Sequence, residues 1–68
     1  MKLNDTQKQI LKLIVLGKSN YEIAEQLNYS LANIKKNIQF CYRYFNVHNR
    51  ASLVRETMLL AFADNNFF

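Results

Sequence analysis

Apolar residues recur at intervals of three and four along four stretches of the chain, which is the spacing of one face of an α-helix. The stretches cover residues 5–16, 20–27, 31–45 and 50–64, and short polar segments separate them. No stretch alternates apolar and polar residues over the length of a strand. The pattern predicts an all-α, four-helix bundle-like domain with short connections.

Polar residues suited to cap a helix precede each stretch. The candidate N-caps have a side-chain oxygen that can accept a backbone N–H; they are Asn4, Ser19, Ser30 and Asn49. Gln7 and Glu22 follow the first two at the spacing of a capping box. Gly17 and Asn46 follow the first and third helices and suit the left-handed conformation that ends a helix. These signals predict where each helix begins and ends.

The third helix has a single apolar stripe. Its predicted inward residues are Leu31, Ile34, Ile38, Cys41 and Phe45. The fourth helix is different, because it is apolar on more than one side. Leu53, Val54, Thr57, Leu60 and Ala61 make one face.

The other apolar residues of the fourth helix have no place in so small a core. A chain of 68 residues forms one domain, residues 1–68, and buries only part of its surface. We therefore expect Met58, Leu59 and Phe62 to be exposed, together with Phe67 and Phe68. Exposed apolar patches mark interfaces, so the sequence predicts a homodimer through Met58, Leu59 and Phe62.

Several classes of protein are excluded by composition. Cys41 is the only cysteine and His48 the only histidine, so neither a disulfide framework nor a zinc site is predicted. No nucleophile–base pair or carboxylate pair appears, so no enzyme and no cofactor are predicted. The apolar runs are too short for a membrane span, and no signal peptide is visible. We expect a cytoplasmic protein.

Positive charge is concentrated in the second half of the chain. Lys and Arg outnumber Asp and Glu by nine to five, giving a net charge of +4. Residues 26–55 contain no acid, and their cations are Lys35, Lys36, Arg43, Arg50 and Arg55. A solvated basic helix would explain this charge as well as a nucleic-acid surface would. The connection favours DNA: a short helix ends at Leu27, and a longer one follows Ser30, as in a helix-turn-helix.

The residues that carry this pattern also carry a family resemblance. Gly17-Lys18-Ser19-Asn20-Tyr21-Glu22-Ile23-Ala24 and the later Val47-His48-Asn49-Arg50 resemble the LuxR/GerE-type DNA-binding domain, over roughly residues 3–62. The resemblance implies a transcription regulator whose third helix, about residues 31–45, enters the major groove of double-stranded DNA. It also implies dimerisation through the fourth helix.

Charge, helix ends and the resemblance together suggest a set of DNA-binding residues. They are Asn20, Tyr21, Ser30, Asn33, Lys35, Lys36, Gln39 and Arg43. By the resemblance, Lys36 and Gln39 face the bases, Lys35 lies at the DNA surface, and Asn20 and Tyr21 lie near phosphate. Lysine donates to guanine, and glutamine pairs with adenine. Arg50 matches an arginine expected to brace the start of the fourth helix against the first.

The chain departs from the family pattern in ways that bear on function. Gln7 and Gln9 stand where acids are usual, Asn37 where His is usual, and Asn46 where Gly is usual. Met1 lies two residues before the resemblance starts, which leaves open a free-standing regulator or an excised piece. An alternative function also stays open: a small interaction protein that pairs with a larger transcription regulator through the fourth helix.

Overall fold

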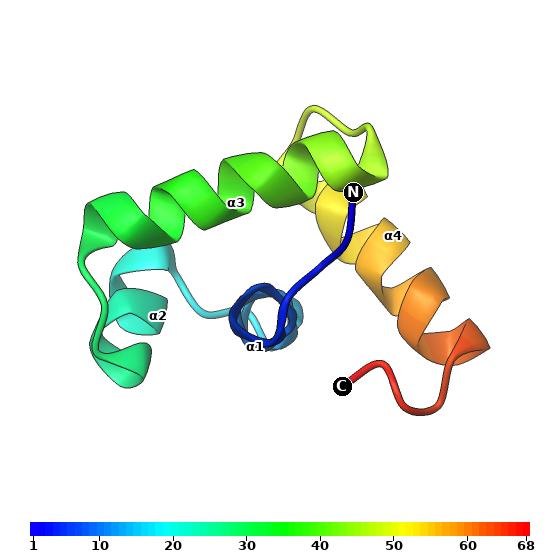
Figure 1. Cartoon of the computed structure of the whole chain (residues 1–68), viewed down its shortest axis with the longest axis horizontal. Helices are drawn as coiled ribbons and strands as arrows, with labels where there is room; N and C mark the ends of the chain where they lie inside the picture. Colours follow the sequence, from blue (N-terminus) through cyan, green and yellow to red (C-terminus); the bar gives the residue numbers. More distant parts are fainter.

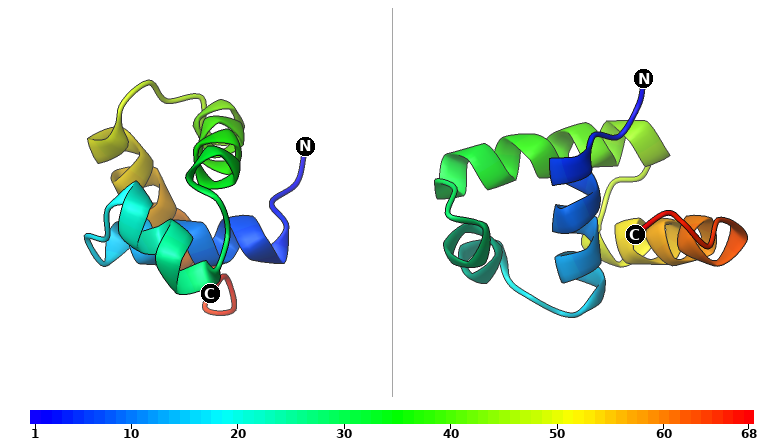
Figure 2. Two further views of the ribbon diagram at one scale, coloured as in Figure 1. Left: turned by 90° about the vertical axis from the view of Figure 1, so that its left-hand side faces the viewer. Right: turned by 60° about the horizontal axis from the view of Figure 1, so that its bottom comes forward.

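The computed structural model describes residues 1–68 and consists of four helices and no strand. They are α1 (Asp5–Val15), α2 (Asn20–Leu27), α3 (Leu31–Phe45) and α4 (Arg50–Ala63). In Figure 1, α3 lies across the top, α1 is seen end-on beneath it, and α2 and α4 lie on opposite sides of α1. The turned views of Figure 2 show α1 running crosswise beneath α3. The predicted all-α fold is confirmed, and each helix has its predicted bounds to within one residue.

The helix ends form because their side chains supply the missing hydrogen bonds. Asn4 Oδ1 accepts from the Gln7 backbone N–H at 2.8 Å, and Ser19 Oγ accepts from that of Glu22 at 3.1 Å. Both capping boxes are complete. Gly17 (φ +86°) and Asn46 (φ +54°) are left-handed, as their positions after α1 and α3 predict. Local chemistry therefore determines where the helices begin and end.

One apolar core joins the four helices, and α1 lies at its centre. Fully buried residues come from every helix; among them are Ile10, Leu11, Ile23, Ile34 and Leu53. The Cys41 thiol is also fully buried, and desolvation raises its pKa to about 11. Because α1 packs against each of the other three helices, it holds α2 and α3 in a fixed relation.

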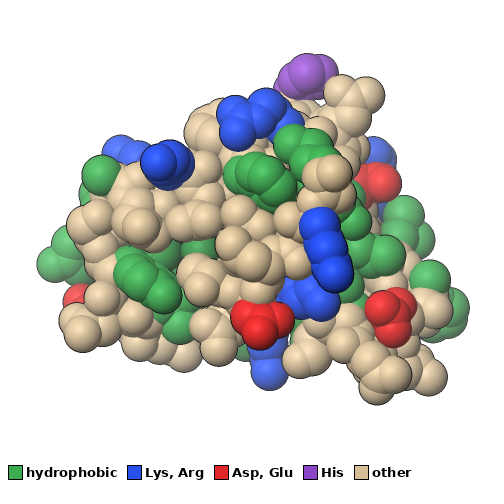
Figure 3. Space-filling model, viewed as in Figure 1, with side chains coloured by type: hydrophobic (Ala, Val, Ile, Leu, Met, Phe, Trp, Pro, Cys, Tyr) green, Lys and Arg blue, Asp and Glu red, His purple; other side chains and the backbone are tan.

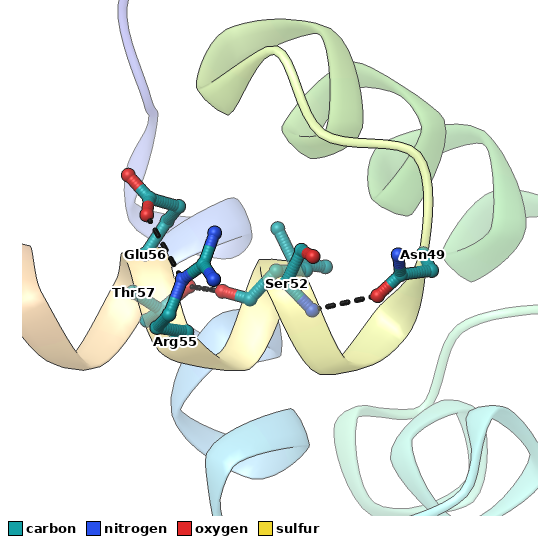
Figure 4. Close-up of polar contacts among 6 residues, drawn as sticks. Asn49, Ser52, Arg55, Glu56 and Thr57 are labelled. Carbon is teal, nitrogen blue, oxygen red and sulfur yellow. Dashed lines mark hydrogen bonds and ion pairs between the residues drawn. The ribbon is translucent and has the colours of Figure 1, made fainter.

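The inner face of α4 includes one buried hydroxyl. Thr57 is fully buried, and its Oγ1 donates to the Leu53 carbonyl oxygen at 2.8 Å, one turn earlier (Figure 4). The same view shows Asn49 Oδ1 accepting from the Ser52 backbone N–H at 2.8 Å, which caps the helix. On the outer side, Arg55 and Glu56 form the one ion pair of the protein, at 3.4 Å.

Neutral amides connect the first turn of α1 to α3. Gln7 Nε2 donates to Asn37 Oδ1 at 3.2 Å, and Asn37 Nδ2 donates to Asn33 Oδ1 at 2.9 Å. Gln7 is buried although it is polar, so these bonds satisfy a group that would otherwise be costly to desolvate. Two of the positions that depart from the family pattern, Gln7 and Asn37, thus contact each other directly.

Two expectations about the core are wrong. Leu31 was predicted to face inward, but it is 38% exposed, because it begins α3 at the edge of the molecule (Figure 1). Phe67 was predicted to be exposed, but it is buried. A turn at Asp64 brings it back, with the Phe67 backbone N–H donating to the Asp64 carbonyl oxygen at 3.0 Å. The ring then lies 5.6 Å from Lys8 Nζ of α1, in cation–π range.

Candidate nucleic-acid interface

α2 and α3 are joined by a tight three-residue turn. Asn28 adopts the left-handed conformation (φ +60°), and the Tyr29 backbone N–H donates to the Ala24 carbonyl oxygen at 3.0 Å, which closes α2. Ser30 then caps α3, its Oγ accepting from the Asn33 backbone N–H at 3.0 Å. Two helices joined by such a turn, with the second longer and more exposed, form a helix-turn-helix.

The outward face of α3 is cationic. Lys35, Lys36, Gln39 and Arg43 are all exposed, and their spacing of three and four residues puts the last three on one stripe. None of the three cations has an acidic partner, since the only ion pair lies on α4. In Figure 3, Lys and Arg side chains gather along the upper edge of the molecule, over α3. The face has the charge that suits a polyanion.

The remaining predicted DNA-binding residues lie around the ends of α2 and α3. Tyr21 is 68% exposed in the first turn of α2, and Ser30 and Asn33 are exposed at the start of α3. The Asn33 side-chain oxygen accepts from Asn37, so its amide N–H groups stay free for another acceptor. Asn20 is half-buried, and its Oδ1 accepts a hydrogen bond from Arg50.

Arg50 is braced differently from the sequence prediction. Its Nη1 donates to Asn20 Oδ1 at 2.7 Å and its Nη2 to the Lys18 carbonyl oxygen at 2.9 Å. Asn20 begins α2 and Lys18 lies in the connection between α1 and α2, so neither acceptor lies within α1 and the expected contact with the first helix is wrong. Gln7, at a position where the family usually has an acid, bonds instead to Asn4 and Asn37.

Two adjoining hollows connect these residues. Asn20, Lys35, Ile38, Gln39, Tyr42 and Arg50 line the first, which we call the Arg50 hollow. The second lies towards the end of α3 and includes Gln39, Tyr42, Arg43 and His48. Tyr21, Ser30, Asn33 and Lys36 line neither hollow. The structure thus brings Asn20, Lys35 and Gln39 together.

Sequence reasoning left two residues out of this surface. Tyr42 is not among the predicted DNA-binding residues, and Arg50 was expected only as a brace, yet both line the Arg50 hollow. The absence of acids between residues 26 and 55, which includes Arg50, was the signal that could have placed it there.

The acid in the first turn of α2, Glu22, is already occupied by the helix cap. Glu22 Oε1 accepts from the Ser19 backbone N–H at 2.8 Å, which completes the α2 capping box. Hydrogen bonds from Ser19 lower the pKa of this carboxyl. Glu22 forms no ion pair, so the cations of α3 and Arg50 keep their full charge for a ligand.

The outer face of α4 carries a separate apolar patch, which we call the α4 patch. Its most exposed members are Met58 (53%), Leu59 (58%) and Phe62 (88%). Together with Ala51, Val54 and Arg55 they line one shallow, almost wholly apolar groove. The exposure predicted for these three residues is therefore confirmed.

The helix-turn-helix and the cationic face of its second helix define a DNA-binding domain of the regulatory type. A family model described as bacterial regulatory proteins, luxR family, matches residues 1–57. The chain belongs to this family, a family of DNA-binding regulators rather than of enzymes. Searches of curated proteins and of solved structures find no match. None of the four helices has the length and apolar character needed to cross a membrane.

Proposed function

We propose that residues 1–68 act as a single helix-turn-helix domain that binds double-stranded DNA sequence-specifically and regulates transcription. α3 enters the major groove, where Lys36 and Gln39 contact base edges. Lys35 and Arg43 flank them and neutralise phosphates, while Asn20, Tyr21, Ser30 and Asn33 hold the backbone on either side. The domain uses no cofactor in this role.

One observation carries the proposal: the exposed face of α3 holds Lys35, Lys36 and Arg43 without any acidic partner. A solvated basic helix would gain from interspersed acids, because like charges repel each other. α3 contains none. The charge therefore has its counterpart outside the protein, and DNA supplies it.

We propose further that the protein binds as a homodimer through the α4 patch. A symmetric dimer uses the same surface on both protomers, and the α4 patch is apolar enough to match itself. The protomer is about 30 Å long, which is close to the roughly 34 Å between half-sites one helical turn apart. The expected operator is a palindrome.

The proposal is tested by selecting binders from a pool of random duplexes at two salt concentrations and sequencing them. We expect a palindrome to be enriched at both. Lys36→Ala should weaken binding without changing the melting temperature. Lys12→Ala, which removes an exposed lysine of α1 outside both the α3 face and the α4 patch, should leave affinity within about twofold of the unmodified protein. Weak binding that disappears with salt and enriches no sequence would refute sequence-specific recognition.

The exposed Phe62 also favours a second candidate, a small protein that pairs with a larger transcription regulator through the α4 patch. Under this alternative, the protein forms a complex with a full-length family member, and free DNA binds only weakly. A pull-down with such a relative, done beside the DNA selection, separates the two functions.

A further inference from the structure

We propose that the Arg50 hollow holds one phosphate of the DNA backbone, gripped by Arg50 from one side and Lys35 from the other. This proposal rests on the proposed function. The phosphate contact would hold the start of α4 against the bound duplex. Arg50 is the first residue of α4, and Lys35 lies in the second turn of α3. The two cations therefore reach the hollow from different helices.

The hollow offers donors and lacks a negative group. Its polar residues are Asn20, Lys35, Gln39, Tyr42 and Arg50, and none of them is acidic. The Lys35 ammonium, the Gln39 amide and the Tyr42 hydroxyl make no hydrogen bond within the protein. A site with several free donors and two positive charges is matched to an anion with several acceptor oxygens, which describes a phosphate.

Arg50 is pre-positioned for this contact. Its two hydrogen bonds, to Asn20 Oδ1 and the Lys18 carbonyl oxygen, fix the plane of the guanidinium. The other N–H groups of the guanidinium have no acceptor in the protein. Because the guanidinium is already fixed, binding a phosphate costs little further side-chain entropy. Most of the interaction energy between the two groups therefore contributes to the binding free energy.

Bracing alone does not account for the charge. The two acceptors of Arg50 are neutral oxygens, and a neutral amide donor would serve them. The half-buried guanidinium has no carboxylate within ion-pair distance, and Lys35 lines the same hollow. An anion in the hollow would be attracted by both positive charges. The charge thus indicates a ligand rather than a structural contact.

The experiment uses duplexes of the selected operator in which single phosphates are replaced, one at a time, by uncharged methylphosphonates. With the unmodified protein, we expect a loss of about tenfold or more in affinity at one position next to the major groove, on the scale of a charge-assisted hydrogen bond. In Arg50→Gln, the loss at that position should fall to about twofold or less, while losses at other positions stay unchanged.

Three further variants keep the result interpretable. Lys35→Gln should abolish the same single loss of affinity. Lys35 makes no hydrogen bond or ion pair within the protein, so this substitution breaks none. If Arg50→Gln fails to fold, Lys35→Gln still tests the proposal. Lys12→Gln, which removes an exposed lysine of α1 that lines neither the Arg50 hollow nor the α4 patch, should leave the whole pattern unchanged. Arg50→Lys should restore part of the loss, since it returns the charge without the planar fork.

Failure of the inference differs from failure of the proposed function. If the protein selects an operator but no methylphosphonate position depends on Arg50 or Lys35, the phosphate contact is refuted and DNA recognition stands. If the unmodified protein selects no operator, both are refuted. If millimolar inorganic phosphate shifts the Arg50 side-chain resonances while every methylphosphonate duplex binds normally, the hollow is a site for free anions, which also overturns the assignment.

Discussion

Replacing Phe62 should separate dimerisation from folding more cleanly than any other change. Phe62 is 88% exposed in the protomer, so its loss removes almost no packing within one chain. If the α4 patch pairs with itself, the same ring is buried in the dimer. Phe62→Ala is preferred to Phe62→Asp, because a carboxylate in the last turn of α4 would face the negative end of the helix dipole.

The expected size follows from symmetry. Burying a phenylalanine side chain contributes about 1.5–3 kcal/mol, and a two-fold dimer loses two of them, or about 3–6 kcal/mol in total. The dimer dissociation constant should therefore rise by about two to four powers of ten. The free energy of unfolding of the monomer should change by less than about 0.5 kcal/mol, because an exposed residue makes few contacts within its own chain.

Sedimentation equilibrium over a range of concentrations measures the dissociation constant, and thermal unfolding at a concentration where both proteins are monomeric measures stability. Leu16→Ala is the matched control, since Leu16 is 63% exposed at the end of α1 and lies outside the α4 patch. It should leave the dimer unchanged. Equal dissociation constants for Phe62→Ala and the unmodified protein would refute the dimer. A fall in melting temperature of more than about 8 °C would show instead that Phe62 packs within the protomer.

Three other changes test the site and the core. Arg43→Gln should lower the slope of log affinity against log salt by about 0.9, with nearly unchanged thermal stability, because Arg43 is exposed. An unchanged slope would mean that Arg43 neutralises no phosphate. Thr57→Val should leave the free energy of unfolding equal or slightly higher, because the added methyl group fills the space of the buried hydroxyl. Thr57→Ser removes a buried methyl group and should lower the free energy of unfolding by about 1 kcal/mol. Chemical denaturation measures both values, and a large loss of stability in the valine variant would contradict the packing argument. The Cys41 thiol, whose pKa burial raises to about 11, should resist iodoacetamide at pH 8 in the folded protein and react fully in urea; fast modification without urea would mean that α3 opens readily.

Helix ends were predictable from sequence because their chemistry is local. The side chain of Ser19 and the carboxylate of Glu22 lie three residues apart, and their reciprocal bonds depend on nothing else in the chain. Helical periodicity also assigns each residue to a face, which is why exposed Phe62 and buried Leu53 were both expected. It does not say where along its axis a helix meets its neighbours. Leu31 is on the correct face of α3 but beyond the packed region.

Contacts between distant segments were beyond this reasoning. Phe67 is buried because a turn at Asp64 carries it onto α1, and no periodic pattern in the last residues indicates that return. At the candidate site, the contacts of Arg50 were likewise not predictable from the sequence pattern. Its partners, Asn20 and the Lys18 carbonyl, lie about thirty positions earlier and were visible only in three dimensions. The cationic character of the surface was predictable from sequence, whereas the hollow that organises it was not.

The position of Arg50 links the two surfaces of the protein. It begins α4, and Phe62 lies twelve residues further along the same helix, about 18 Å away at the rise of an α-helix. If Arg50 holds a phosphate and Phe62 holds the partner protomer, then one rigid helix fixes the distance between the DNA backbone and the dimer axis. Operator spacing would then depend on α4 more than on α3. Inserting one base pair between half-sites should therefore weaken binding by the dimer, while Phe62→Ala, which binds as a monomer, should be indifferent to the insertion.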